Sequence, residues 1–284
     1  MTATADATPP ASAGRADGYS SPLPTPRPHL GHALASEWTK LTSVRSTVWT
    51  LGSLVALVVG IGLLAVLQTD SGDYTSIPFV APALFGMMVG QLAVIVLGVL
   101  TVSSEYGTGL IRTTFTAAPD RLRVLTAKYL VFGTVAFGVT LGSAGFVGIA
   151  AALLHSGPAA GHHGGGEWLG ALGGCFYVTL LGVLALAVGS LVRHSAGAIA
   201  VMLGLVTMPP VLGGILTMWP VTKGIGLTVV SYNAPVGLIQ LFGLPNSGMN
   251  GSPAPSAPAQ LGLLVLVTAL TVAASYVVVR RRDV

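Results

Sequence analysis

The sequence is short of charge and of cysteine. Only 8% of its 284 residues are Asp, Glu, Lys or Arg, whereas soluble domains carry about 25%. Hydrophobic residues make up 52%, and the mean hydropathy is +0.79. So few charges cannot cover a globular domain with a solvated surface, so we interpret the chain as a membrane protein with several spans. The single cysteine, Cys175, excludes an internal disulfide and a metal site made of several cysteines.

Motifs for catalysis and nucleotide binding are absent as well. The sequence has no G-x-x-x-x-G-K-[ST], no H-E-x-x-H and no G-x-S-x-G, so we expect no ATPase activity and no catalytic residue in this chain. His162 and His163 stand together in a glycine-rich loop, but two histidines are too few for a fixed metal site. We therefore expect neither a metal nor another cofactor here. Basic residues form no nucleic-acid footprint, so we expect no nucleic-acid partner.

Six stretches without Asp, Glu, Lys, Arg or His are long enough to cross a bilayer, which takes about 20 apolar residues. They are Val48–Leu67, Phe79–Val102, Tyr129–Leu154, Leu169–Val192, Ala196–Met218 and Gln260–Val279. The predicted fold class is therefore all-α, with six transmembrane helices. Small residues four apart, such as Gly86 and Gly90 or Gly138 and Gly142, are typical of close helix contacts. Spans without ionisable groups argue against a proton-coupled or ion-coupled transporter and against a membrane enzyme.

Two different segments precede the first span. Residues 1–31 are rich in Pro, Ala and Ser, which predicts a disordered cytoplasmic tail. Residues 32–47 carry Leu34, Trp38 and Leu41 on one stripe at helical spacing. We predict an amphipathic helix on the membrane surface there. A simple extension of the first span into the cytosol is the alternative.

The charges between the spans predict the orientation. With the N-terminus inside, twelve of the 13 Lys and Arg residues are cytoplasmic and only Lys223 is outside. Cytoplasmic loops of membrane proteins are rich in Lys and Arg, so we expect both termini in the cytoplasm. Residues 48–284 then form one transmembrane domain.

One further apolar stretch, Gly224–Gly243, is interrupted by Asn233 and Pro235. As a seventh span it would move Arg280 and its neighbours to the outside. We therefore predict two half-helices that enter the outer leaflet and turn back, within an outer segment and loop at residues 219–259. Non-helical backbone at that depth must pack against protein or line a cavity.

Much of the chain's charge lies in one connection, residues 103–128, between the second and third spans. Asp120 follows Pro119 and is suited to cap the helix that enters the third span. The pattern favours a helical hairpin that projects into the cytosol and presents Glu105, Arg112 and Arg121 to a partner. The alternative is an ordinary basic loop whose arginines meet anionic lipid.

This connection resembles that of a known family. The residues concerned are Ser104-Glu105-Tyr106, Ile111-Arg112-Thr113-Thr114, Pro119, Arg121, Arg123, Val124-Leu125 and Ala127-Lys128. They are similar to a stretch in the integral-membrane permease subunits of ATP-binding-cassette transporters of the type-2 exporter class, in particular the actinobacterial members. The six-span order, the N-terminal interfacial helix and the broken outer segment are similar too.

The resemblance implies that residues 103–128 form a coupling helix in a groove of a separate cytosolic ATPase subunit. It places the contacts at Glu105, Arg112, Thr113, Pro119 and Arg121. It also implies that the partner binds ATP and Mg²⁺, and that a second permease chain completes a homodimer or heterodimer in a bacterial plasma membrane. The substrate route would lie between the chains, along the second and fifth spans. No substrate-binding residue is predicted. A sensory or resistance complex that signals through an ATPase without transport is the alternative function.

Overall fold

The computed structural model describes residues 29–107, 109, 120–244 and 255–281, and the regular secondary structure of these residues is helical throughout. Six helices are long and apolar enough to cross a membrane. They are α2 (Arg45–Leu67), α3 (Ala81–Gly107), α5 (Arg121–His155), α6 (Gly165–Val192), α7 (Ser195–Leu216) and α10 (Ala257–Arg281). The predicted all-α fold with six span helices is confirmed, and it is the organisation of a multi-pass membrane protein.

The helices α3 and α5 are longer than their predicted spans. They contain 27 and 35 residues, whereas a bilayer crossing needs about 20. Their additional turns lie beside the connection at residues 108–119. The predicted cap of α5 is confirmed, since the Asp120 side chain accepts a hydrogen bond of 3.2 Å from the Arg123 backbone N–H. The ends of α3 and α5 that flank residues 108–119 therefore extend beyond their predicted spans.

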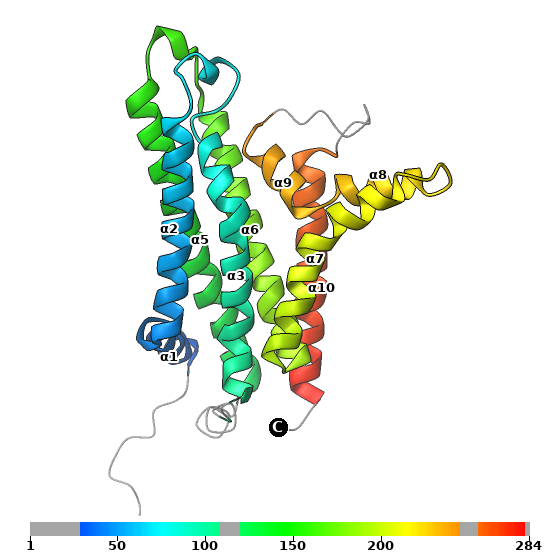
Figure 1. The fold of residues 1–284 in the computed structure, drawn as a ribbon. Helices are drawn as coiled ribbons and strands as arrows, with labels where there is room; N and C mark the ends of the chain where they lie inside the picture. The colour runs from blue at the N-terminus through cyan, green and yellow to red at the C-terminus, as the bar shows by residue number, and fades with distance from the viewer. Residues whose placement is uncertain (1–28, 108, 110–119, 245–254, 282–284) are drawn as a thin grey trace, which may run out of the picture.

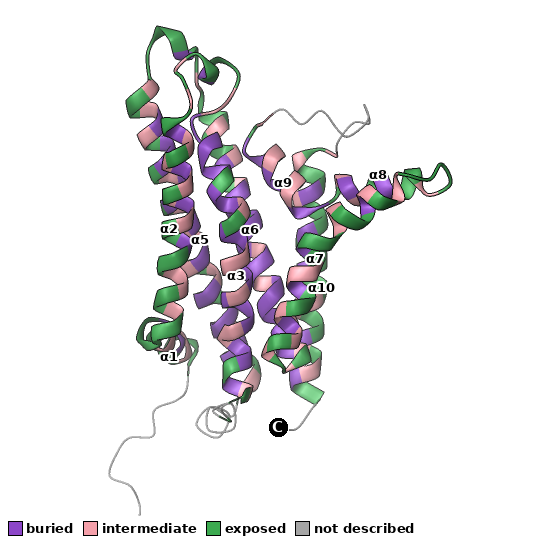
Figure 2. Cartoon of the chain, in the orientation of Figure 1, coloured by how far each residue is buried: buried purple, intermediate pink, exposed green. Residues whose placement is uncertain are grey.

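The centre of the bundle is made by α3 and α6, which Figure 2 shows as the most continuously buried helices. Their backbones touch, because a Cβ added to Gly98 would collide with the Gly182 carbonyl oxygen. Of the small residues noted in the sequence, Gly86 faces the backbone of Val58 in the same way. Gly138 and Gly142 instead have open space beside them, so their spacing marks no helix contact among the described residues.

The two ends of the bundle differ in charge. The helix α1 (Leu30–Ser43), the last turn of α3, the start of α5 and the last turn of α10 lie together at one end (Figure 1). We call this the basic end, because it carries most of the described Lys and Arg side chains, including those of Lys40, Arg121 and Arg280. The opposite end carries two short 3-10 helices, η1 (Asp73–Thr75) and η2 (Pro158–Ala160).

At the opposite end, the chain forms the predicted broken segment. The helices α8 (Lys223–Ser231) and α9 (Ala234–Leu241) are bent by 53° at the break between them. Figure 1 shows that α7 ends and α10 begins at this end, so α8 and α9 turn back instead of crossing the bundle. The Asn233 side chain caps α9 by accepting a 2.9 Å hydrogen bond from the Val236 backbone N–H.

The helix before the first span differs from its prediction. It begins at Leu30 and ends at Ser43, because Val44 adopts an extended conformation with ψ 116°. Arg45 therefore begins α2, whereas residues 32–47 were predicted as one helix. Figure 1 shows α1 running across the basic end, as a surface helix would, so it does not extend the first span. Of the predicted tail, residues 1–28 lie outside the described residues.

Candidate functional site at the basic end

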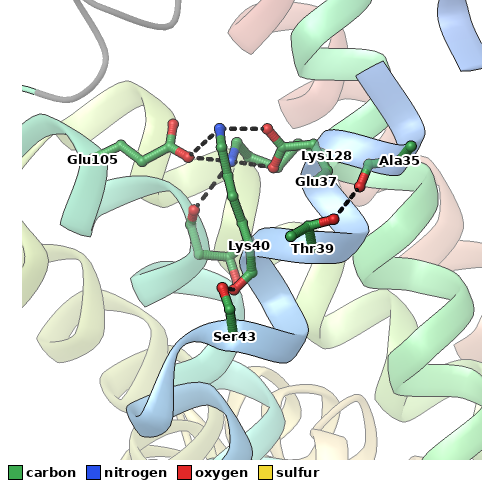
Figure 3. A network of polar contacts seen from close by, with 8 residues as sticks. Ala35, Glu37, Thr39, Lys40, Ser43, Glu105 and Lys128 are labelled. Atoms are coloured by element: carbon green, nitrogen blue, oxygen red, sulfur yellow. Dashed lines mark hydrogen bonds and ion pairs between the residues drawn. The ribbon is translucent and has the colours of Figure 1, made fainter. Parts of the chain in front are cut away.

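Four charged side chains from three helices meet at the basic end (Figure 3). Glu37 and Lys40 come from α1, Glu105 from the last turn of α3 and Lys128 from α5. We call them the four-charge cluster. The Lys128 ammonium lies 2.6 Å from Glu37 Oε2 and 2.9 Å from Glu105 Oε1. Lys40 Nζ lies 2.8 Å from Glu37 Oε1 and 3.0 Å from Glu105 Oε1, which completes the ring of contacts.

Three of these side chains are buried. Glu37 and Lys128 are 3% exposed and Glu105 is 7% exposed. Burying a charge is costly unless it is paired and hydrogen-bonded, and two ammonium groups here neutralise two carboxylates. Lys40 shows the balance directly: burial alone would lower its pKa, but the Glu37 hydrogen bond and the Glu105 charge outweigh burial and raise the pKa above its usual value.

The cluster joins the parts that surround the 108–119 connection. Glu105 is three residues before residue 108, and Lys128 is two turns inside α5. Both bind Glu37, directly or through Lys40, so both sides of the connection are fastened to α1. Lys128 Nζ also donates to the Thr101 carbonyl oxygen at 3.4 Å. The last turn of α3 and the start of α5 are therefore linked to α1 by ion pairs.

The position of Glu105 corrects one expectation from the sequence. We expected its carboxylate on the exposed surface of the hairpin, but the structure turns it inward onto Lys128 and Lys40. The reason is that both ammonium groups lie on the inner face, where a carboxylate must neutralise them. Arg121 begins α5 and is half-buried. The remaining predicted contact residues, Arg112, Thr113 and Pro119, lie outside the described residues.

Sequence reasoning missed Glu37, Lys40 and Lys128 as parts of this site. From the sequence alone, Glu37 and Lys40 have no assigned role, and Lys128 is only a cytoplasmic cation and part of the stretch that resembles the permease family. One clue was present: a Glu and a Lys three residues apart on a surface helix, in a chain with only 9 acidic residues. That clue identifies the pair but not the helices that it meets.

A third cation, Arg193, lies beside the cluster. The Arg193 guanidinium carbon is 5.1 Å from the centroid of the Tyr106 ring, which is a cation–π distance. Arg193 ends α6 in the left-handed conformation, with φ 57°. This contact brings the α6–α7 corner against the last turn of α3, next to Glu105.

The histidines of the glycine-rich loop have a structural role at the opposite end. His163 Nδ1 lies 2.8 Å from Glu167 Oε1, and Nε2 lies 2.9 Å from the Ala160 carbonyl oxygen. The His163 ring also stacks on Phe79, with 3.8 Å between the ring centroids. These contacts fasten the loop to α6 and to the start of α3. Within the described ranges, no group of three His, Cys, Asp or Glu side chains is arranged to hold a metal.

No protein-family model matches this chain, and no curated protein matches it either. The family resemblance therefore rests on the residues of the 103–128 connection and on the order of the spans.

Proposed function

We propose that this chain is the membrane permease subunit of an ATP-binding-cassette exporter, driven by ATP hydrolysis in a separate cytosolic subunit. The observation that carries the proposal is the way in which the ends of α3 and α5, on either side of residues 108–119, are held in place. The helices that flank these residues, α3 and α5, are longer than a bilayer crossing, and buried ion pairs fasten the facing ends of these helices to α1. A loop that served only as a topology signal would need its net charge alone, not buried ion pairs that link three helices.

In this proposal the basic end faces the cytoplasm of a bacterial plasma membrane. The connection docks in a groove of the ATPase subunit, which binds ATP and Mg²⁺, and Arg112, Thr113, Pro119 and Arg121 make the contacts. Glu105 has a different role from the one first expected: it positions the connection through Lys128 and Lys40. When the ATPase subunit pushes the connection, α1, α3 and α5 move together and tilt the spans.

The proposal includes a second permease chain, as a homodimer or heterodimer, with the substrate route between the two. In this proposal the second chain packs against the outer face of α7, whose apolar side chains Val201, Leu205 and Val211 are each more than half exposed. The helix α3 is largely buried inside its own bundle. We therefore assign most of the lining to α7, the fifth span, and less to α3, the second.

The test compares charge reversals at the same end of the molecule. Arg112→Glu should weaken binding of the ATPase subunit that co-purifies with the tagged chain, or uncouple its hydrolysis, while Arg280→Glu should do neither. Breaking a desolvated charge pair at an interface costs about 2–5 kcal/mol, and about 1.4 kcal/mol changes affinity tenfold. Pull-down and ATPase assays at matched membrane levels provide the measurement.

Two outcomes would count against the proposal. If both variants behave like the parent, the connection is only a basic loop. If the ATPase binds and is stimulated but proteoliposomes of the complex move no substrate from a panel of drugs, lipids and peptides, the signalling alternative is favoured. Uncoupler-sensitive transport by the isolated chain would contradict an ATP-driven permease directly.

A further inference from the structure

A groove of about 440 Å³ lies between α2 and α5, on the side of the bundle away from α7 (Figure 1). Its lining comes from two valines of α2 and from a small-residue stretch of α5, namely Val55, Val59, Gly138, Gly142, Ser143 and Phe146. A Cβ added to Gly138 or Gly142 would have no atom of the described residues within 4 Å. The groove therefore leaves the backbone of α5 uncovered along two turns.

One polar group in the groove lacks a partner. Ser143 is only 5% exposed, and its hydroxyl makes no hydrogen bond to the described residues, whereas the Thr140 hydroxyl on the same helix donates to the Ala136 carbonyl oxygen at 2.9 Å. Buried hydroxyls that lack a partner and are completely enclosed belong to Tyr74, Ser103 and Thr268. The Ser143 hydroxyl is not enclosed in this way, so it opens into the groove that this residue lines.

The position of Ser143 along the helix limits what can occupy the groove. The residue lies near the middle of the predicted span Tyr129–Leu154, where lipid acyl chains offer no hydrogen-bonding group. A hydroxyl without a partner is costly in an apolar medium. A transmembrane helix offers backbone carbonyl oxygens, and serine side chains form hydrogen bonds across helices in membranes. The groove therefore suits a helix better than an acyl chain.

We propose that the groove receives α5 of a second copy of this chain, so that two copies associate through α2 and α5. The helix that enters must be narrow, because its backbone has to come close to the Ser143 hydroxyl. The α5 face itself meets this requirement, since Gly138 and Gly142 leave its backbone uncovered. The same two glycines therefore open the groove of one copy and make α5 of the other copy narrow enough to enter it.

This contact is isologous, because the same face serves both copies. It is also separate from the contact assigned to α7, since α2 and α5 lie on one side of the α3–α6 centre and α7 lies on the other (Figure 1). The inference therefore does not depend on the proposed transport function. With both contacts occupied, neighbouring transporters are linked to one another in the membrane.

The experiment uses the purified full chain in lipid vesicles, in a Cys175→Ser background. Ile149→Cys and Leu153→Cys, tested one at a time, place a thiol on the exposed side of α5 beyond Phe146, where the parent side chains are 54% and 78% exposed. Oxidation should link two copies through either thiol. Leu263→Cys, at a lipid-exposed position of α10, controls for random collisions and should give about tenfold less dimer.

Substitutions in the groove, each combined with Ile149→Cys, test its role. Gly142→Leu fills the groove and should lower the cross-linked fraction about tenfold. Gly204→Leu is the matched control on α7, because this glycine also has open space beside it, and should leave the fraction unchanged. Ser143→Ala should weaken association about threefold, which corresponds to about 0.6 kcal/mol for one interhelical hydrogen bond. It should not lower the thermal stability of the chain, because the hydroxyl has no partner there.

Three results would overturn the proposal. The first is cross-linking of Ile149→Cys and Leu153→Cys that does not exceed that of Leu263→Cys. The second is cross-linking that Gly142→Leu leaves unchanged, which would mean that lipid fills the groove and the helices only collide. The third is a disulfide to a different protein in native membranes with none between copies, which would assign the groove to another subunit. Leu205→Cys reports separately on the α7 contact, so failure of that contact is distinguishable from failure of this one.

Discussion

Two buried polar junctions, one at each end of the bundle, hold short helices by different means. At the basic end, α1 is fastened by charged groups: Lys128 meets Glu37 and Glu105 at 2.6 and 2.9 Å. At the opposite end, the α8–α9 pair is fastened by neutral amides. Gln260 of α10 donates to the Ser231 carbonyl oxygen at 3.0 Å and to Gln240 Oε1 at 3.3 Å. Asn233 and Gln260 are as buried as the charged groups, at 4% and 3% exposed.

The difference between charged and neutral side chains reflects the different structural roles of the two junctions. The amides satisfy backbone groups at the break between two short helices, which must be paired where water is excluded. The charges link side chains of three separate helices, so they serve to fix one helix against another. Removing one member of a buried ion pair typically costs about 3–5 kcal/mol, because it leaves an uncompensated charge. Removing a helix cap costs about 0.5–2 kcal/mol.

The largest expected effect concerns the side of the membrane on which each junction lies. In a Cys175→Ser background, His162→Cys and Ser252→Cys should react with an impermeant maleimide in intact cells, whereas Ala117→Cys should not. The effect is all-or-none, because the bilayer excludes the reagent. Labelling of Asp283→Cys in intact cells would place the basic end outside and overturn the six-span orientation.

The next effect concerns the charged junction. Lys128→Met should lower the free energy of unfolding by about 3–5 kcal/mol, because two carboxylates then share the Lys40 ammonium. Thermal unfolding in detergent provides the measurement, and Lys223→Met, at an exposed lysine, is the matched control. Glu37→Gln combined with Lys128→Met leaves Lys40 paired with Glu105 and should be less destabilised than Lys128→Met alone. Equal losses in the single and double variants would mean that packing, not charge, fastens α1.

The smallest effect concerns the neutral junction. Asn233→Ala removes the acceptor that caps α9 and the donor to the Val230 carbonyl oxygen, and should cost about 1 kcal/mol. Asn233→Asp keeps the capping oxygen but places an unpaired, buried carboxylate oxygen against the Val230 carbonyl oxygen, so its loss should be larger than that of Asn233→Ala. The same unfolding assay measures both. A loss in Asn233→Ala as large as that of Lys128→Met would erase the distinction between the two junctions.

Features that depend on neighbours in the sequence were predictable. Six charge-free stretches became six helices, because a long apolar run in a bilayer must satisfy its backbone internally. Asp120 caps α5 through an N–H three residues ahead, and the break near Asn233 was visible because an Asn and a Pro interrupt an apolar run. Each of these depends on contacts within a few residues, which the linear order already contains.

The candidate site was only partly predictable. The sequence drew attention to Glu105 through its charged surroundings, but it implied exposure, whereas the side chain is buried against Lys128 and Lys40. Glu37 and Lys128 are 91 residues apart, and Lys40 and Glu105 are 65 apart. No periodicity in either segment specifies such partners.

The sequence by itself therefore determined the helices, their order and the end of the bundle at which each charge lies. Hydropathy and capping depend on nearby residues, and the orientation depends on the total charge of each loop. All three can be read along the chain. Only the tertiary structure decided which small residues touch, why α1 turns at Val44 and which charges pair. Gly86 meets the Val58 backbone while Gly142 faces open space, although both belong to the same kind of spacing. These outcomes depend on how the helices pack around α3 and α6, and helix packing is a property of three-dimensional contacts that sequence spacing does not contain.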